Sequence, residues 1–435
     1  MVNSSVENPI IRARVLRRIS WRLIPFMALL YFVAFLDRVN IGFAALSMNH
    51  DLGFSATVYG TGAGIFFIGY FLFEVPSNLL LEKVGARRWI ARIMITWGVI
   101  SACMAFTNGP RTFYTLRFLL GVAEAGFFPG MILFLTYWFP TAYRARIVGA
   151  FLIAIPVSSV IGAPVSTLVL GLNGLGLRGW QWLFIIEGLP SVLLGFAVLF
   201  FLTDKPEVAT WLSREEKDWL AGVLNAERKE REAVHNLSLR QALLNPRVWL
   251  LALTYFGVLI GLYGFGLWLP QIIKAFGEIS NIQVGLLTAI PYSFAALLMY
   301  FWGWHSDLTG ERRLHVSLPA FLGAVGLAAS AFLDSSPTLA LIALTVSAIG
   351  IYSALPSFWT LPTAMLSGTA AAGGIALINS IGNLGGYLGP SIMGYLKDRT
   401  QNFKYGLLVL SAFIAISGVL VLMGGRTRAP KDIAT

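Results

Sequence analysis

The chain has 435 residues, of which 57% are hydrophobic and only 12% are charged, whereas an average soluble domain carries roughly 25% charged residues. A soluble protein of this size cannot bury so much apolar surface, because a single core stops growing near ~250–300 residues. The composition also excludes a disordered chain and a disulfide-rich scaffold, since Cys103 is the single cysteine. We therefore interpret the chain as a polytopic membrane protein.

Twelve apolar segments are long enough to cross a bilayer, which needs about 20 helical residues per crossing. The sequence therefore predicts an all-α fold with twelve transmembrane helices. The expected spans are residues 22–46, 57–81, 88–107, 112–138, 146–171, 181–202, 247–269, 282–304, 314–333, 337–365, 371–395 and 405–424.

The distribution of positive charge predicts the orientation of these spans. Of the 32 Lys and Arg residues, 24 fall in segments on the same side as the two termini, six fall in the opposite loops and two lie within spans. Because cytoplasmic loops are enriched in Lys and Arg, we expect both termini to be cytoplasmic, in a bacterial inner membrane. The net charge of +11 is then a topology signal, with membrane lipid as a contact partner and no nucleic acid partner.

A charged segment at 204–246 divides the spans into six and six. The two halves also repeat, because Gly-Ala-Arg-Arg at 85–88 has a counterpart, Gly-Glu-Arg-Arg, at 310–313. We therefore expect an N-terminal six-helix bundle at 1–203, a cytoplasmic linker at 204–246 and a C-terminal six-helix bundle at 247–435. Duplicated bundles of this kind place a binding site at mid-membrane between them.

The twelve spans, the central linker and the loops at 78–88 and 303–313 resemble the major facilitator superfamily over essentially the whole chain. The segments 35–43, 117–130 and 182–188 are similar to those of its anion:cation symporter family. Within that family the chain looks most like bacterial transporters of tartrate and similar hydroxy or sugar acids. The resemblance implies two pseudo-symmetric bundles around a central cavity, transport by alternating access, and a monomer as the expected state.

Five ionisable residues stand out inside the apolar spans: Asp37, Arg38, Glu74, Arg117 and Glu124. Each costs at least ~2.5–3.5 kcal/mol in a bilayer helix and therefore requires a partner or a function. Two interpretations remain open. These residues form buried structural ion pairs, or they form a proton-coupled anion site. In such a site an Arg holds a carboxylate through a two-pronged contact, and an acid that loses its Arg to the substrate takes up a proton.

In the family that the chain resembles, the acids of helices 1 and 4 are the protonatable pair, and the helix 1 arginine contacts the substrate carboxylate. This implies proton coupling at Asp37 and Glu124 and substrate binding at Arg38. Arg117 matches the helix 4 arginine, so we place it among the substrate-binding residues and expect it to pair with an acid. Tyr70 matches a tyrosine of the family's substrate site.

The C-terminal spans carry almost no charge, so we expect uncharged polar contacts to the substrate there. Tyr263 lies 226 residues after Asp37, at the repeat equivalent of that acid. The other candidates, of which the last matches the family's helix 11 asparagine, are Trp359, Thr360, Asn379 and Asn383. The alternative is that these side chains bridge neighbouring helices, as buried amides and hydroxyls commonly do in membranes.

Each of the two repeated loops carries an acid before its arginines. We expect Glu82 with Arg88, and Asp307 with Arg313, to act as gating pairs that close the cytoplasmic side when the outside is open. The enrichment of positive charge in cytoplasmic loops explains the arginines but not the acids.

These patterns favour a secondary transporter that brings a small organic carboxylate inward with protons, and they exclude an enzyme. The sequence shows no nucleophile elbow, Walker motif or metal-ligand spacing, so we expect no catalytic residue, cofactor or metal. The alternatives are a symporter of aromatic acids such as hydroxyphenylacetate or phthalate, an anion exchanger, and an anion-binding membrane sensor. Coupling to Na⁺ in place of H⁺ also stays open.

Overall fold

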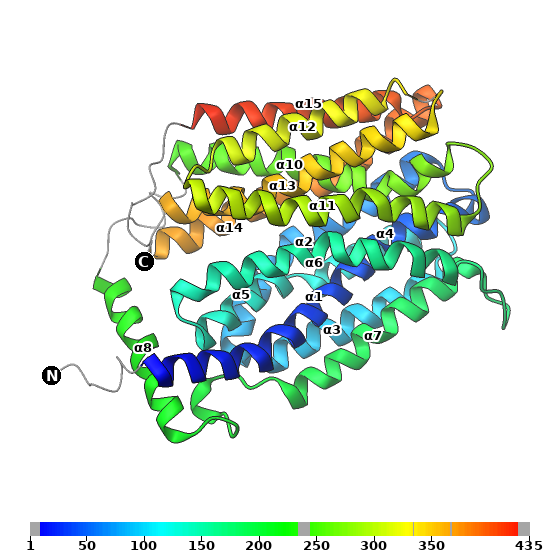
Figure 1. The fold of residues 1–435 in the computed structure, drawn as a ribbon. Helices are drawn as coiled ribbons and strands as arrows, with labels where there is room; N and C mark the ends of the chain where they lie inside the picture. Colours follow the sequence, from blue (N-terminus) through cyan, green and yellow to red (C-terminus); the bar gives the residue numbers. More distant parts are fainter. Residues whose placement is uncertain (1–8, 234–243, 334, 366–367, 425–435) are drawn as a thin grey trace.

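The computed structural model describes residues 9–233, 244–333, 335–365 and 368–424, and this part of the chain is almost entirely α-helical (Figure 1). Its helices are α1 (Pro9–Leu52), α2 (Ala56–Val84), α3 (Ala86–Cys103), α4 (Pro110–Glu124), α5 (Phe127–Trp138), α6 (Thr141–Val169), α7 (Gly179–Phe201), α8 (Arg214–Ala233), α10 (Pro246–Lys274), α11 (Asn281–Thr309), α12 (Leu314–Ser330), α13 (Pro337–Met365), α14 (Gly368–Thr400) and α15 (Lys404–Met423).

Each of the twelve expected spans falls on helical structure. Among the described residues, 10 helical stretches are long and apolar enough to cross a membrane, and α4 and α5 together form one of them, Pro110–Trp138. The apolar helix α12 is shorter, with 17 residues, and α14 has 33 residues. The prediction of an all-α polytopic membrane protein is confirmed.

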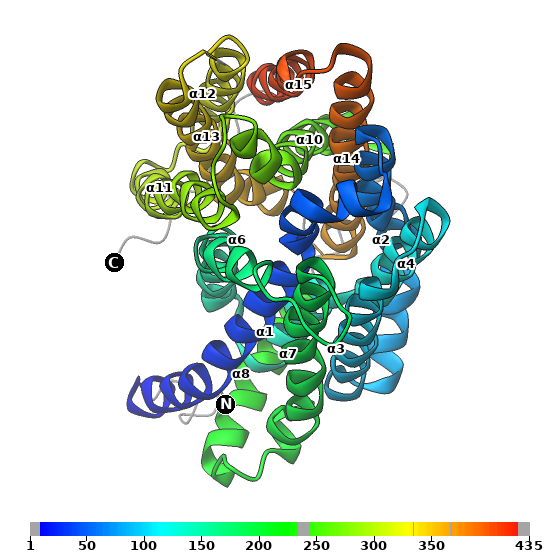
Figure 2. The ribbon, with the colours of Figure 1, turned by 90° about the vertical axis from the view of Figure 1, so that its right-hand side faces the viewer.

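The spans pack into two groups, which we call the N-terminal bundle (α1–α7) and the C-terminal bundle (α10–α15) (Figure 2). In the N-terminal bundle α3 packs along α7 and α2 packs along α4. In the C-terminal bundle α10 packs along α14 and α12 packs along α13. The bundles meet chiefly along two pairs of helices, α2 with α14 and α6 with α11.

Glycines bring the two bundles into close contact at one end of the molecule. A Cβ added to Gly60 of α2 would lie 2.3 Å from the Pro390 carbonyl oxygen of α14. One added to Gly285 of α11 would lie 2.0 Å from Thr167 Oγ1 of α6. Small residues at such points let helix backbones approach each other closely. We call this end the distal end, and we call the opposite end, where α8 lies, the proximal end.

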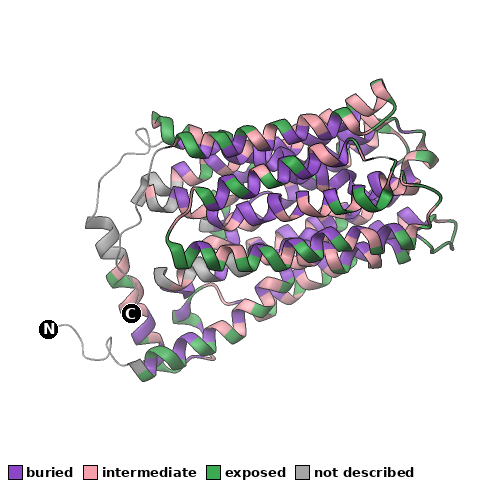
Figure 3. Cartoon of the chain, turned by 45° about the horizontal axis from the view of Figure 1, so that its top comes forward, coloured by how far each residue is buried: buried purple, intermediate pink, exposed green. Residues whose placement is uncertain are grey.

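Exposed residues occur along the outside of both bundles (Figure 3), and many of them are large and apolar. Phe200 of α7, Leu297 and Phe301 of α11 and Val325 of α12 are all exposed. Extensive exposed apolar surface marks a protein or membrane interaction site. Its distribution around both bundles fits an outer surface that contacts lipid.

The fourth span breaks directly after Glu124. Gly126 adopts a left-handed backbone conformation, with φ of 85°, and the helix restarts at Phe127. The Ser77 hydroxyl of α2 donates a hydrogen bond to the Ala125 carbonyl oxygen at 2.6 Å, which satisfies an acceptor that the break exposes. The break makes Glu124 the last residue of α4, at the point where the chain turns.

We expect Gly126→Ala to lower the free energy of unfolding by about 1–3 kcal/mol, because a non-glycine residue is strained at this φ and its Cβ would lie 2.3 Å from Ser77 Oγ. The measurement is thermal unfolding in detergent. Gly109→Ala is the matched control, since Gly109 has an extended φ of 175° and open space around it. Equal melting temperatures for the two variants would contradict the role of the break.

Candidate functional site

Arg38 of α1 lies where the two bundles meet and contacts both of them. Its guanidinium donates a hydrogen bond to the Tyr263 hydroxyl of α10 at 2.9 Å and forms an ion pair with Glu124 at the end of α4. Only 11% of the Arg38 side chain and 2% of the Glu124 side chain are exposed. Arg38 Nε has no hydrogen-bond partner among the described residues, so the guanidinium retains donor capacity for a further ligand.

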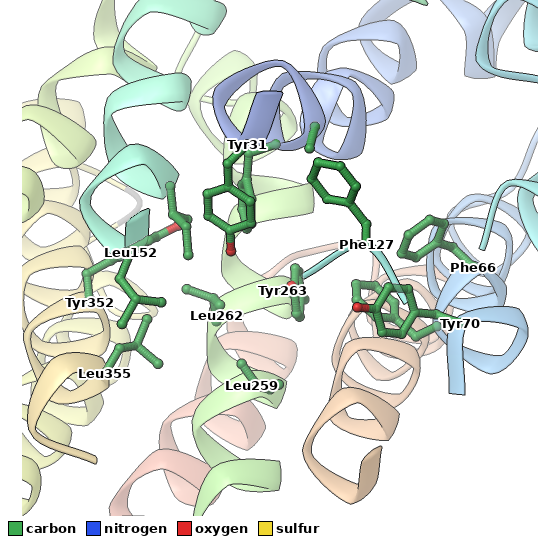
Figure 4. Close-up of a cluster of buried hydrophobic side chains, with 14 of the residues drawn as sticks. Tyr31, Phe66, Tyr70, Phe127, Leu152, Leu259, Leu262, Tyr263, Tyr352 and Leu355 are labelled. Carbon is green, nitrogen blue, oxygen red and sulfur yellow. The ribbon is translucent and has the colours of Figure 1, made fainter. Parts of the chain in front are cut away.

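Aromatic rings surround the Arg38 guanidinium. Its carbon lies 5.0 Å from the ring centroid of Phe35, 5.5 Å from that of Phe66 and 5.7 Å from that of Tyr70. A cation at such distances is attracted to the ring face. Tyr70 and Tyr263 belong to the same buried cluster (Figure 4). The structure thus brings together four of the predicted site residues: Arg38, Tyr70, Glu124 and Tyr263.

Arg117 lies on α4, two turns before Glu124, and its hydrogen bonds go to the backbone of α2. Nη2 donates to the Ala63 carbonyl oxygen at 2.9 Å and Nε donates to the Gly62 carbonyl oxygen at 3.3 Å. The expectation that Arg117 pairs with an acid is therefore wrong in this structure. The physical reason is that a helix carbonyl has a second lone pair, so α2 supplies acceptors without any acidic side chain.

Asp37 precedes Arg38 on α1 and faces the interior of the N-terminal bundle. Its carboxylate accepts hydrogen bonds from the hydroxyl of Ser191 on α7 at 2.7 Å and from that of Ser101 on α3 at 2.9 Å. The Asn40 amide donates a third, at 3.3 Å. Adjacent helical residues point about 100° apart, which separates the surroundings of Asp37 from those of Arg38.

Glu74 links the two bundles through two residues of α14, the predicted site residue Asn379 and its neighbour Ser380. Its carboxylate accepts hydrogen bonds from the Asn379 amide and, at 3.3 Å, from the Ser380 hydroxyl. Glu74 is buried. Asn379, which is predicted to contact the substrate, therefore serves as a contact between bundles in this structure.

The other predicted residues of the C-terminal bundle lie on α13 and α14. The Trp359 ring packs edge-on against Tyr255 of α10, with ring centroids 4.9 Å apart. Thr360 Oγ1 donates to the Ser357 carbonyl oxygen of its own helix at 2.7 Å. Asn383 is buried on α14, one turn beyond Asn379.

Glu187 of α7 is a buried acid for which the sequence pattern gives no role. The Ser166 hydroxyl of α6 donates to its Oε1 at 2.6 Å, and its Oε2 has no partner in the described part of the chain. The signal that could have found it is present in the sequence, since Glu187 is an acid within the apolar segment 181–202.

The predicted gating residues of the C-terminal half lie at the proximal end of α11. Asp307 forms an ion pair with Arg312 at 2.6 Å, and Arg313 donates to the carbonyl oxygens of Val421 and Leu422 on α15. The expected pair of Asp307 with Arg313 is not formed in this structure, where the bundles are in close contact at the distal end, and it stays a prediction for the state that is open at that end. The guanidinium of Arg313 lies against the end of α15, where the last carbonyl groups of a helix lack partners.

In the N-terminal half, Arg88 is exposed, and the side chain of Glu82 lies outside what the structure describes. The neighbouring Arg87, at the start of α3, contacts Asp204. Its backbone N–H donates to the Asp204 carboxylate at 2.7 Å, which ties the start of α3 to the segment after α7.

The distal end carries a contact between bundles that the sequence does not predict. Asp398, near the end of α14, accepts hydrogen bonds from the backbone N–H groups of Ala56 at 2.9 Å and Thr57 at 2.7 Å, the first residues of α2. Partial burial opposes ionisation of Asp398, but the hydrogen bonds from Thr57, Ser55 and Ala56 outweigh it and lower the pKa of this carboxyl. A carboxylate is also favoured at a helix N-terminus by the helix dipole.

Comparison with known proteins matches residues 27–390 and 274–434 to the Major Facilitator Superfamily. The chain belongs to this family. A protein of Agrobacterium vitis named "Putative tartrate transporter" is 56% identical over 433 residues, which cover 99% of this chain and 98% of that protein. The "Quinolone resistance transporter" of Acinetobacter baumannii is 47% identical over 407 residues, which cover 93% of this chain and 94% of that protein.

A solved structure shows the same fold. A bacterial homologue of the human lysosomal transporter Spinster, in an inward-facing and occupied conformation, matches with a TM-score of 0.74 at 16% sequence identity, covering 92% of this chain and 96% of that one. This likeness confirms the predicted fold of two six-helix bundles. Together with the family and the relatives, it establishes a membrane transporter and not an enzyme.

We expect Glu74→Ala and Asn379→Ala to be non-additive in thermal stability, because both remove the same hydrogen bond between the bundles. A double-mutant cycle on the melting temperature in detergent should give a coupling equivalent to about 0.5–3 kcal/mol. The matched cycle pairs Glu74→Ala with Asn383→Ala, on the same helix as Asn379. Coupling of equal size in both cycles would show that the effect is not specific to the Glu74–Asn379 bond.

Proposed function

We propose that this transporter carries a small organic carboxylate, a tartrate-like hydroxy acid or a sugar acid, into the cell together with protons. The Agrobacterium vitis relative supports the substrate class, because it is named as a tartrate transporter and matches nearly the whole chain. Transport proceeds by alternating access between the two bundles.

The observation that carries this proposal is the ion pair of Arg38 with Glu124, beside Tyr263 of the opposite bundle. A guanidinium binds a carboxylate through two parallel N–H bonds, so a substrate carboxylate competes with Glu124 for the same donors. Displaced Glu124 is a buried carboxyl without a cation. It takes up a proton, because an unpaired buried charge costs several kcal/mol. Binding of substrate and binding of a proton are coupled in this way.

Acids outnumber arginines in the middle of the N-terminal spans. Among the described side chains of these spans, the buried acids are Asp37, Glu74, Glu124 and Glu187, and the arginines are Arg38 and Arg117. If every acid were ionised, the negative excess would oppose the entry of an anion. Protonation of the acids removes this negative excess. The anion therefore binds more favourably when protons are bound, and protons bind more favourably when the anion is bound. We assign proton coupling to Asp37 and Glu124.

The substrate carboxylate binds Arg38, and its hydroxyls bind polar side chains of both bundles. Asn379 is released from Glu74 when it turns to the substrate, which connects substrate binding to the contact between α2 and α14. Arg117 lies near the same aromatic ring as Arg38, with its guanidinium carbon 5.1 Å from the Phe66 ring centroid. The assigned hydroxyl contacts are Tyr70, Tyr263, Trp359, Thr360, Asn379 and Asn383.

The orientation follows from the positive charge near the proximal end, which we assign to the cytoplasm. Both termini are then cytoplasmic, in a bacterial inner membrane, with lipid around a monomer. The segments 1–203 and 247–435 move as two bodies joined by the linker 204–246. Opening to the outside separates α2 from α14 and α6 from α11 at the distal end, where Gly60, Gly285 and Asp398 hold the bundles together in this structure.

A second candidate is an aromatic acid. The rings of Phe35, Phe66 and Tyr70 around Arg38 favour it, because aromatic faces stack on an aromatic substrate while the guanidinium holds its carboxylate.

The test of the proposal is uptake into proteoliposomes under an imposed inward proton gradient, with tartrate, a sugar acid, hydroxyphenylacetate and phthalate as substrates. We expect accumulation of a hydroxy or sugar acid that an uncoupler abolishes. A parallel arm replaces the proton gradient with a sodium gradient. Accumulation driven by sodium alone, or exchange without accumulation, would contradict the proposal, and preference for hydroxyphenylacetate or phthalate would favour the second candidate.

We expect Glu124→Gln to retain counterflow exchange of the substrate and to lose proton-driven accumulation, because an amide cannot take up the transported proton. The measurement compares both activities in proteoliposomes. Glu278→Gln, which changes an exposed acid in the loop after α10, is the matched control and should accumulate substrate like the unmodified protein. Loss of exchange and accumulation to the same extent in Glu124→Gln would remove the coupling role.

A further inference from the structure

Four helices of the N-terminal bundle meet around a buried group of polar side chains, which we call the Asp37–Glu187 cluster. It lies inside the bundle, apart from the ion pair of Arg38 with Glu124. All of its members are buried. They are Asp37 and Asn40 of α1, Ser101 of α3, Ser166 of α6, and Glu187 and Ser191 of α7.

The two acids of the cluster differ in how well they are hydrogen-bonded. Asp37 accepts three hydrogen bonds, from two serines and from Asn40. Glu187 accepts one, from Ser166 at Oε1, and its buried Oε2 has no partner among the described residues. Asn40 and Asp37 both lie close enough to Glu187 to act on its charge. The cluster therefore contains two neighbouring acids, of which Asp37 has three hydrogen-bond donors and Glu187 has one.

No arginine or lysine contacts either acid in the described part of the chain. On α1 the guanidinium of Arg38 is directed to Glu124 and Tyr263 instead. The helix α3 presents Ser101 and Trp97 to Asp37, and α6 presents Ser166 to Glu187. The other charged group that acts on Asp37 is Glu124, which is also an acid.

Two neighbouring carboxylates without a cation cannot both ionise inside a bundle, because like charges and loss of water both oppose the second charge. The donors present are sufficient for one carboxylate, namely Asp37 with its three hydrogen bonds. Glu187, with one donor and one unsatisfied oxygen, is better suited to the protonated form.

We propose that Asp37 and Glu187 bind one transported proton between them, and that Glu187 is a further proton-coupling residue of this protein. The inference rests on the proposed function, which assigns a transported proton to Asp37. Arg38 follows Asp37 directly on α1. The proton bound by the cluster and the anion bound by Arg38 therefore both contact the same turn of this helix. The proton site is thereby connected to the site of the anion.

The experiment measures proton-driven uptake as a function of pH in proteoliposomes, together with counterflow exchange. We expect Glu187→Gln to retain exchange and to move the pH midpoint of uptake about one unit lower, since a lone acid binds a proton less readily than one beside a second acid. Glu187→Asp keeps the pair and should restore the original midpoint. Ser158→Ala, which alters a buried hydroxyl of α6 that donates to a backbone carbonyl, controls for changes in packing.

A midpoint unchanged in Glu187→Gln, with uptake reduced equally at every pH, would overturn the inference and leave Glu187 as a structural residue. If Glu187→Gln does not fold, Asp37→Asn is measured instead, and a midpoint equal to that of the unmodified protein would overturn it too. Unmodified protein that shows no proton-driven uptake would refute the proposed function itself. The two failures are therefore distinguishable.

Discussion

A guanidinium in the interior of a membrane protein needs acceptors that compensate its lost hydration, and Arg38 takes them from both bundles. Glu124 supplies the counter-charge from α4, Tyr263 supplies a hydroxyl from α10, and aromatic rings cover the guanidinium. Removing Glu124 or Tyr263 would leave the buried charge of Arg38 incompletely compensated. The position of α1, the break after α4 and the approach of α10 are all tied to this requirement.

The acids of the N-terminal bundle are distributed over two environments with different chemistry. Glu124 is paired with the guanidinium of Arg38, which the proposed substrate carboxylate would take from it. Among the described residues, Asp37 and Glu187 accept hydrogen bonds from hydroxyl and amide donors and not from a cation, which is the setting of the proposed proton site. Asp37 and Arg38 point about 100° apart on α1, so in the proposed function the protons and the anion occupy separate places beside one helix.

Much of the fold could be predicted from the sequence, because hydrophobic length and the positions of Lys and Arg are local properties. The same reasoning located the charged residues, since each interrupts an apolar run. It could not locate their partners. In this structure Arg117 binds backbone carbonyls of α2 and Arg313 binds those at the end of α15, and both contacts depend on how helices pack. Glu187 carried the same signal as Glu124, and its environment became visible only when α1, α6 and α7 were placed together.

The contacts between the bundles at the distal end are made largely by backbone atoms and small side chains. Gly60 lies against Pro390, and Gly285 lies against Thr167. These contacts involve none of the side chains assigned to the substrate, so they do not depend on its chemistry. A change in the residues around Arg38 would leave these contacts between the bundles in place. Two relatives that match nearly the whole chain, at 47% and 56% identity, carry names as different as quinolone resistance and tartrate transport, which fits an architecture whose distal contacts are separate from the site around Arg38.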